Sequence, residues 1–201
     1  MALIQIRLIV GGNKYLPDFG SAIIAGYKDG WSHVDAVVPA GLDWATEGWL
    51  FGARMDTLAG VPRGVQLRPP GYTTFRRCGI LTIPVTETQW TAFWEAQHAK
   101  HGRPYDWRSI VAFAAPFGLT RDWHEADSWI CSEAVEDSLE VARVLSSFWL
   151  APYKISPGMV AARIEVLPRV WFTEIKQGTA PRDEAGIALE DWRFHCDGVA
   201  T

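Results

Sequence analysis

The sequence predicts an α+β domain in which an antiparallel sheet packs against helices. Short segments that alternate apolar and polar residues, the pattern of a strand with one buried face, fill the first part of the chain. Segments with a helical period of apolar residues follow one another in the middle, and a strand-like segment comes after them. This order of strands, helices and strands favours α+β over an alternating βαβ arrangement.

The strand patterns come first. In residues 2–10, Ile4, Ile6 and Leu8 alternate with polar residues, which indicates a strand rather than a signal peptide. The turn after Pro39 predicts that the strand following it pairs with the valine-rich strand preceding it. A short apolar stretch within residues 13–30 suits one or two helical turns. The further expected strands are residues 31–39, 42–52, 64–71 and 75–85.

The helical patterns follow. Residues 86–101 place Trp90 and Phe93 on one helical face, with Thr86 as the N-cap and Gly102 as the stop. The remaining expected elements are helices at 107–115 and 128–150 and one or two closing strands within 160–175.

Length and composition indicate one domain with a peripheral tail. The chain has 201 residues, of which 48% are hydrophobic and 21% are charged. A domain of this size can bury a core without disulfides or a structural metal. We expect residues 1–175 to form the domain and residues 176–201 to be a peripheral C-terminal tail.

Charge and cysteine usage exclude several classes of protein. The net charge of −4 disfavours a nucleic-acid binder that works by bulk charge. The sequence contains no run of 18 apolar residues, so we expect no integral membrane segment. Cys78, Cys131 and Cys196 are widely spaced and form no CxxC motif, which indicates reduced thiols. We expect a cytoplasmic protein, or one delivered without a signal peptide, for example with a larger particle.

Cys131 is the candidate nucleophile. Asp127 or Ser128 can cap the helix expected over 128–150, which places Cys131 in its first turn. The helix dipole and the free amides there stabilise a thiolate and can hold the oxyanion of an acyl transfer. A small buried residue on an amphipathic helix has the same local pattern, so the assignment depends on a partner base.

His33 is the candidate base. Strand alternation puts His33 and Asp35 on one face of segment 31–39. A rigid strand can hold an imidazole against a cysteine of another element, and a third polar group would fix the tautomer of the ring. Glu47, in the expected strand 42–52, suits this role if the two strands form a hairpin, and Asp35 is the alternative.

An ordered set of motifs resembles one protein family. The motifs are the strand histidine in SHVDAVV, the acidic residue in ATEGW, the segment GRPYDW, the helix opening CSEAV and the later SPGMV. Over roughly residues 1–172 the chain resembles the circularly permuted, papain-like NlpC-type cysteine hydrolases of the YiiX type, which are related to lecithin–retinol acyltransferases. In this branch the histidine precedes the cysteine along the chain.

The resemblance implies a permuted papain-like fold and a role for each matching residue. Cys131 would be the nucleophile, His33 the base and Glu47 the group that orients His33. Tyr105 matches a tyrosine beside the cysteine, whose hydroxyl can help to bind the oxyanion, and residues 156–158 match a structural turn. The chain departs from the family at position 35, where many members have a small residue, and in the loop 51–70, which matches no family motif.

These residues together predict a cysteine hydrolase that cleaves an acyl bond, with an amide or peptide bond expected first. The substrate classes are a cell-wall peptide, a lipid-linked amide or an isopeptide, and the thiol chemistry requires no metal or cofactor. One alternative is an acyltransferase or thioesterase with the same residues. The other is a non-catalytic protein of a larger particle, in which some of the 11 tryptophans would form an interface. The sequence leaves the oligomeric state open.

Other residues near the expected site have competing interpretations. Trp107, Trp123 and Trp129 flank the site and can line an apolar groove for the substrate or simply pack. A cluster of His124, Glu125 and Asp127 precedes Cys131 and is an alternative base or metal site.

His98 and His101 lie one turn apart on the helix expected over 86–101. This spacing favours a polar helix end over a metal pair, because the sequence suggests no third ligand. Cys78 lies in a strand-like segment, and neither it nor Cys196 has the context of a helix start, so both are interpreted as non-catalytic.

Overall fold

The computed structural model describes residues 1–11, 30–57, 60–73, 75–114, 124–147 and 155–175. The short helical stretch expected within 13–30, Trp123, Cys196 and the tail 176–201 lie outside these residues. The described elements are β1 (Ala2–Gly11), β2 (His33–Val37), β3 (Leu50–Arg54), β4 (Gly64–Arg68), β5 (Phe75–Val85), α2 (Glu87–Ala99), α3 (Trp107–Ala114), α4 (Cys131–Val141), α5 (Pro157–Glu165) and β6 (Trp171–Ile175).

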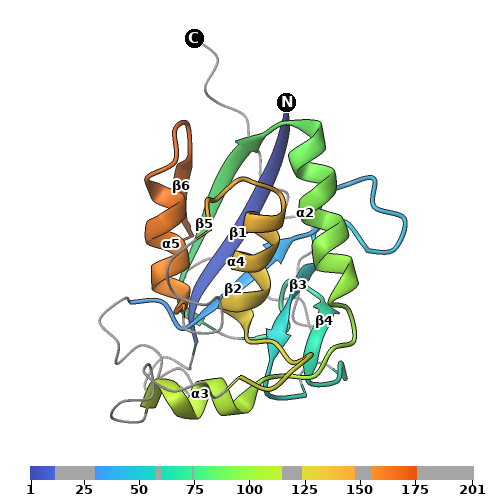
Figure 1. Ribbon diagram of the computed structural model, residues 1–201, viewed down its shortest axis with the longest axis vertical. Coiled ribbons are helices and arrows are strands. Elements are labelled where there is room, and N and C mark those ends of the chain that lie inside the picture. The colour runs from blue at the N-terminus through green and yellow to red at the C-terminus, as the bar shows by residue number, and fades with distance from the viewer. Residues whose placement is uncertain (12–29, 58–59, 74, 115–123, 148–154, 176–201) are drawn as a thin grey trace, which may run out of the picture.

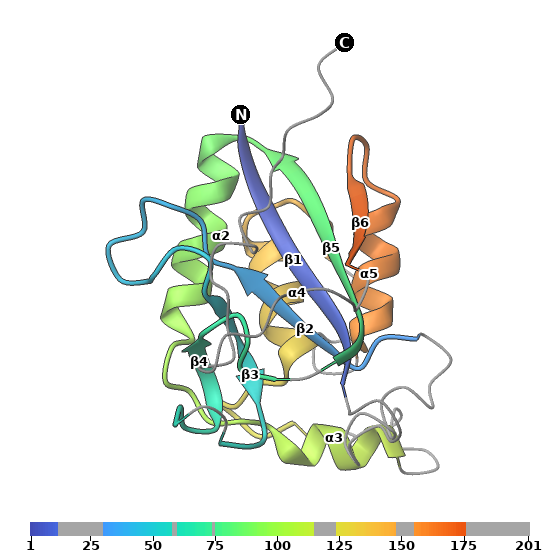
Figure 2. The same ribbon diagram turned by 180° about the vertical axis from the view of Figure 1, so that it is seen from behind.

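The strands form one 6-stranded sheet in the order β4-β3-β2-β1-β5-β6, and every pairing is antiparallel. Figure 1 shows α2, α4 and α5 in front of the sheet and α3 across one end, and Figure 2 shows the same sheet from its other face. The arrangement confirms the expected α+β class with an antiparallel sheet packed against helices.

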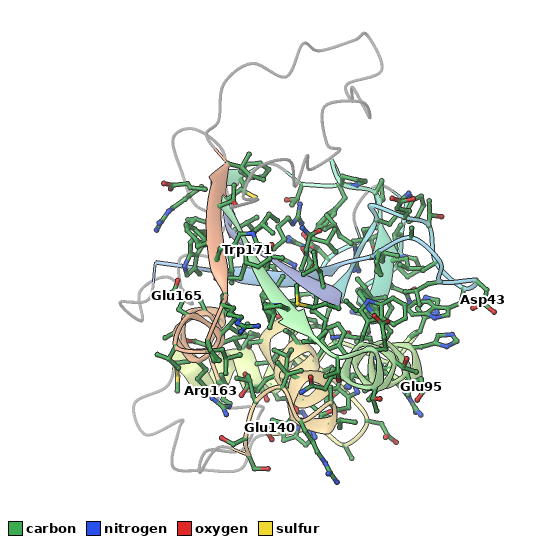
Figure 3. The ribbon with its side chains drawn as sticks, turned by 90° about the horizontal axis from the view of Figure 1, so that it is seen from above. Asp43, Glu95, Glu140, Arg163, Glu165 and Trp171 are labelled. Carbon is green, nitrogen blue, oxygen red and sulfur yellow. The ribbon has the colours of Figure 1, made fainter. Side chains whose placement is uncertain are left out.

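The main hydrophobic core lies between the sheet and the helices. Ile4, Ile6 and Leu8 of β1 are fully buried and belong to one cluster with Phe93 of α2 and Val135 of α4. Seen from above in Figure 3, α2, α4 and α5 form one layer on one side of the strands. The alternating residues of the strands face the other side, where a smaller cluster gathers around Val37, Leu50, Tyr72 and Ile80.

The third strand is shorter than its sequence pattern predicts. β3 begins at Leu50 instead of residue 42, and residues 41–49 form turns in which Gly41 and Gly48 have φ values of 89° and 75°. Glycine adopts this left-handed conformation without the steric penalty that a Cβ would impose. The segment between β2 and β3 is therefore a loop, and the prediction of a strand over its whole length was wrong.

Two helix starts show how local capping decides the boundaries. Thr86 caps α2 as predicted: its Oγ1 accepts from Gln89 N (3.2 Å), and its own N–H donates to Gln89 Oε1 (3.1 Å). The strands expected within 160–175 are only partly correct, because α5 precedes β6. Ser156 Oγ accepts from Met159 N (3.1 Å) and Pro157 follows at the first helical position, so this segment starts a helix.

Candidate active site

Cys131 is the first residue of α4. The preceding residue, Ile130, has the extended backbone of an N-cap (φ −94°, ψ 164°), and its N–H donates to Glu133 Oε2 at 3.3 Å. Neither Asp127 nor Ser128 is the cap, so the helix starts later than predicted. The result places Cys131 within the turn whose amides lack partners inside the helix and whose dipole favours an anion.

The thiol of Cys131 contacts β2. It lies within hydrogen-bonding contact of the His33 side chain and of the Val34 backbone. The ladder between β2 and β3 reaches only as far as Ala36, so the start of β2 is not hydrogen-bonded to β3. Figures 1 and 2 show the N-terminal end of α4 lying over this part of the sheet. The structure thus brings the predicted nucleophile and the predicted base together.

His33 is held by two further groups on its Nε2 atom. Asp35 Oδ1 lies 2.9 Å from Nε2, and the Tyr72 hydroxyl lies 2.9 Å from the same nitrogen. The Tyr72 hydroxyl also donates to Asp35 Oδ2 at 2.9 Å. The carboxylate and the hydroxyl therefore hold the imidazole ring from one side.

Asp35 is itself fixed by Arg7. The two residues are opposite each other in the pairing of β1 with β2, and Arg7 Nη2 lies 2.6 Å from Asp35 Oδ2. Both side chains are 1% exposed. Gly52 of β3 leaves the room that the carboxylate needs, since a Cβ built there would overlap Asp35 Oδ1.

The structure places Glu47 elsewhere. This residue is exposed in the turn before β3, and no described contact joins it to His33. The expectation that Glu47 orients His33 is therefore corrected. The strand that was to carry Glu47 beside β2 starts only at Leu50, whereas Asp35 lies on the same strand face as His33 and contacts it directly.

The opposite charges of Asp35 and of its neighbours His33 and Arg7 stabilise one another. Burial alone would raise the pKa of Asp35, but the charges and hydrogen bonds of His33 and Arg7 lower it well below its ordinary value. Burial alone would lower the pKa of His33, and Asp35 and Cys131 together raise it. The imidazole ring is therefore stabilised as an imidazolium.

The pKa of the Cys131 thiol shifts in the opposite direction to that of His33. Burial alone would raise the pKa of Cys131, but the charge and hydrogen bond of His33 and the backbone of Val34 lower it below the ordinary value. Cys78 is also buried, has no such partner among the described residues, and burial raises its pKa to about 11. In the described part of the chain, the two buried cysteines therefore differ because Cys131 alone has an imidazole beside it.

Tyr105 is the residue expected to help bind the oxyanion. It pairs with Trp129 in a parallel β-bridge just before α3. Burial and then the charge of Cys131 raise the pKa of Tyr105 well above its ordinary value, so its hydroxyl keeps its proton. A neutral hydroxyl at this position is a hydrogen-bond donor.

The two tryptophans expected to line a groove have different environments. Trp129 is half-buried against the main core, and Lys100 Nζ lies 4.8 Å from the centre of its ring. Trp107 is 53% exposed at the start of α3, with the Arg108 guanidinium 6.0 Å from its ring centre. Their proposed role at a substrate groove stays a prediction.

The polar cluster before Cys131 is rearranged relative to the prediction. His124 contacts Asp106 and Glu133, whereas Glu125 and Asp127 face the guanidinium groups of Arg108 and Arg103. His124 therefore remains a candidate metal ligand, but the carboxylates beside it are those of Asp106 and Glu133.

The other histidine pair is exposed. His98 stacks on Trp44 with ring centres 4.3 Å apart, and the ring centres of His98 and His101 are 6.4 Å apart.

Comparison of the chain with protein-family models and with curated proteins finds no match. Among the helices that the structure describes, none combines the length and the apolar character needed to cross a membrane. The case for a function therefore rests on the geometry around Cys131.

Proposed function

We propose that this protein is a cysteine hydrolase that cleaves an acyl bond through Cys131, His33 and Asp35. One observation carries the proposal: a thiol at the first residue of a helix contacts a histidine whose Nε2 lies 2.9 Å from a buried carboxylate. The three side chains come from α4 and β2, which are far apart in sequence. This combination supplies a nucleophile, a proton carrier and a group that orients the carrier.

The reaction follows from these positions. The proton of the thiol resides on His33, and the Cys131 sulfur attacks the acyl carbon. The resulting oxyanion is held by the backbone amide of Cys131 and by the Tyr105 hydroxyl. His33 then gives its proton to the leaving amine, alcohol or thiol, and an acyl-enzyme remains on Cys131. Water, deprotonated by His33, releases the acyl group and regenerates the thiol.

We further propose that the fold is a circularly permuted papain-like fold of the NlpC type. The order of the site residues supports this, since His33 on an early strand precedes the cysteine helix. Asp35 takes the orienting role that the resemblance gave to Glu47. The substrate class we propose is a peptide or lipid-linked amide.

The direct test is capture of the acyl-enzyme. The protein is mixed with p-nitrophenyl acetate, quenched in acid and examined by peptide mass spectrometry. We expect an acetyl group on the peptide that contains Cys131 and a burst of p-nitrophenol equal to the enzyme concentration. Hydroxylamine should remove the acetyl group, because it cleaves thioesters.

The matched control is Cys131→Ala, with Cys78 as the buried cysteine that should stay unmodified in both proteins. Adding a primary amine or an alcohol during turnover separates hydrolysis from acyl transfer. Transfer of the acetyl group to the added acceptor in place of water would favour the acyltransferase alternative. Absence of any adduct on Cys131 in a folded protein would contradict the proposal.

A further inference from the structure

A second cluster of polar side chains lies on the far side of the first turn of α4. His124 Nδ1 is 3.1 Å from Asp106 Oδ2 and 3.7 Å from Glu133 Oε1. The three ligand atoms all lie within 4.8 Å of one another. Asp106 and Glu133 are 0% and 5% exposed, and His124 is 29% exposed.

The two carboxylates are held in place by hydrogen bonds. Asp106 Oδ1 accepts from Ser109 N (3.1 Å), and Oδ2, the oxygen that faces His124, accepts from Ser109 Oγ (2.7 Å) and Glu125 N (3.2 Å). Glu133 uses Oε2 to accept from Ile130 N, and its Oε1 is directed at His124. In metal sites, hydrogen bonds from neighbouring groups orient the carboxylate ligands in the same way.

The buried carboxylates leave negative charge that the neighbouring groups balance only in part. Glu133 Oε1 lies 3.7 Å from His124 Nδ1, a separation longer than a hydrogen bond. The side chains of Asp106 and Glu133 are both buried, so their negative charges repel each other. A cation between the two carboxylates and the imidazole would remove this repulsion.

We propose that Asp106, His124 and Glu133 bind one divalent metal ion of the zinc type. Tetrahedral ligands at about 2.0–2.2 Å from a metal ion lie roughly 3.3–3.6 Å apart. The separations of 3.1 Å and 3.7 Å bracket this range closely. One imidazole nitrogen and two carboxylate oxygens suit Zn²⁺, whereas Mg²⁺ and Ca²⁺ prefer oxygen alone. The ion takes the position of the proton on His124 Nδ1, and water completes its coordination.

The site joins three segments around the nucleophile. Asp106 follows Tyr105, His124 precedes the strand-like residues before α4, and Glu133 lies two residues after Cys131. A bound ion would therefore tie the segment before Cys131 to the first turn of α4. The ion makes no contact with the reacting atoms in this proposal, so the thiol chemistry does not depend on it.

The experiment is a Zn²⁺ titration of the full chain after removal of metals with a chelator. Isothermal calorimetry should show one ion per chain, and saturating Zn²⁺ should raise Tm by about 5 °C or more. The key variant is Glu133→Gln, because a glutamine can still accept from Ile130 N and keep the cap of α4. Its metal-free Tm should equal or exceed that of the unmodified protein, and the Zn²⁺-induced rise should be lost.

Further variants identify the site. His124→Gln should also abolish binding, whereas Cys131→Ser and the double change His98→Ala, His101→Ala should leave it intact. Mg²⁺ and Ca²⁺ should compete poorly. The proposal is overturned if the unmodified protein binds Zn²⁺ only in the millimolar range, or if Glu133→Gln binds Zn²⁺ as well as it does. It is also overturned if Cys131→Ser removes the binding, since the ion would then occupy the thiol site. Acyl-enzyme formation is measured separately on the metal-free protein, so failure of the metal site and failure of the proposed function are distinguishable.

Discussion

Replacing Asp35 by asparagine tests the group on which the proposed site depends most. Asp35 bonds to Arg7, to His33 and to the Tyr72 hydroxyl, and its side chain is 1% exposed. Asparagine keeps the shape but loses the charge, so the buried Arg7 guanidinium loses the carboxylate that pairs with it. Removing one partner of a buried ion pair costs about 3–5 kcal/mol of stability. We also expect turnover to fall about 10²–10⁴-fold, because the imidazolium loses the carboxylate that stabilises and orients it.

The assay compares Asp35→Asn with Glu47→Gln, an exposed carboxylate of the turn before β3. Both are measured for Tm, for turnover and for the pH at which Cys131 becomes alkylated. Asp35→Asn should lower Tm and shift alkylation of Cys131 to higher pH, since the pKa of His33 falls and a neutral imidazole stabilises the thiolate less. Glu47→Gln should change stability by no more than about 0.5 kcal/mol and leave the other two readouts unchanged.

The stability of the unmodified protein at acid pH also tests the role of Asp35. Asp35 has a folded-state pKa below its ordinary value. Its contribution to stability is therefore fully present above the unfolded value of about 3.9 and is lost as the pH falls toward the folded value. Asp35→Asn should flatten this part of the pH–stability curve. If Glu47→Gln impairs turnover and Asp35→Asn does not, the reasoning about the orienting carboxylate is refuted.

Further predictions concern the same site. Tyr72→Phe removes one buried hydroxyl, worth about 1 kcal/mol, and should lower turnover several-fold while the protein stays folded; an unchanged rate would show that the hydroxyl is idle. Gly52→Ala should cost about 1–3 kcal/mol and slow turnover, whereas Gly79→Ala, which meets the ring of Phe172 instead, should only lower Tm; equal effects on turnover would argue against a specific role for Gly52. Turnover should follow a bell-shaped pH profile, rising as the Cys131 thiol ionises below its ordinary pKa and falling as the imidazolium deprotonates above its ordinary pKa; a single alkaline rise would exclude the ion pair.

The parts of the fold that local chemistry decides could be predicted from the sequence. The alternation in residues 2–10 and the capping pair of Thr86 and Gln89 both determine their elements, and the structure agrees. The start of α5 was missed although Ser156 and Pro157 carry an N-cap signal, because the apolar residues after them also suit a strand.

The candidate site could be predicted only in part. Cys131 and His33 have recognisable local contexts, a helix start and a strand. Which carboxylate orients the histidine depends on where β3 begins, and the two glycines that turn the chain before it give only a weak signal. Arg7 and Tyr72 were missed because their roles arise from strand register and from a contact 37 residues away along the chain. A charged residue in the middle of the apolar β1 pattern was the available sign for Arg7.

The central claim is that His33 activates the thiol of Cys131, and the alkylation rate of that thiol tests it most directly. Iodoacetamide labelling is followed by peptide mass spectrometry across pH 5–10 in the unmodified protein and in His33→Ala. Cys78 is the internal reference, since both cysteines are buried and, within the described ranges, only Cys131 contacts an imidazole. The account predicts that Cys131 reacts well below the free-thiol pKa of about 8.5, and that His33→Ala moves its reaction to higher pH. If Cys131 reacts as slowly as Cys78 in both proteins, the thiol is not activated and the proposed chemistry is contradicted.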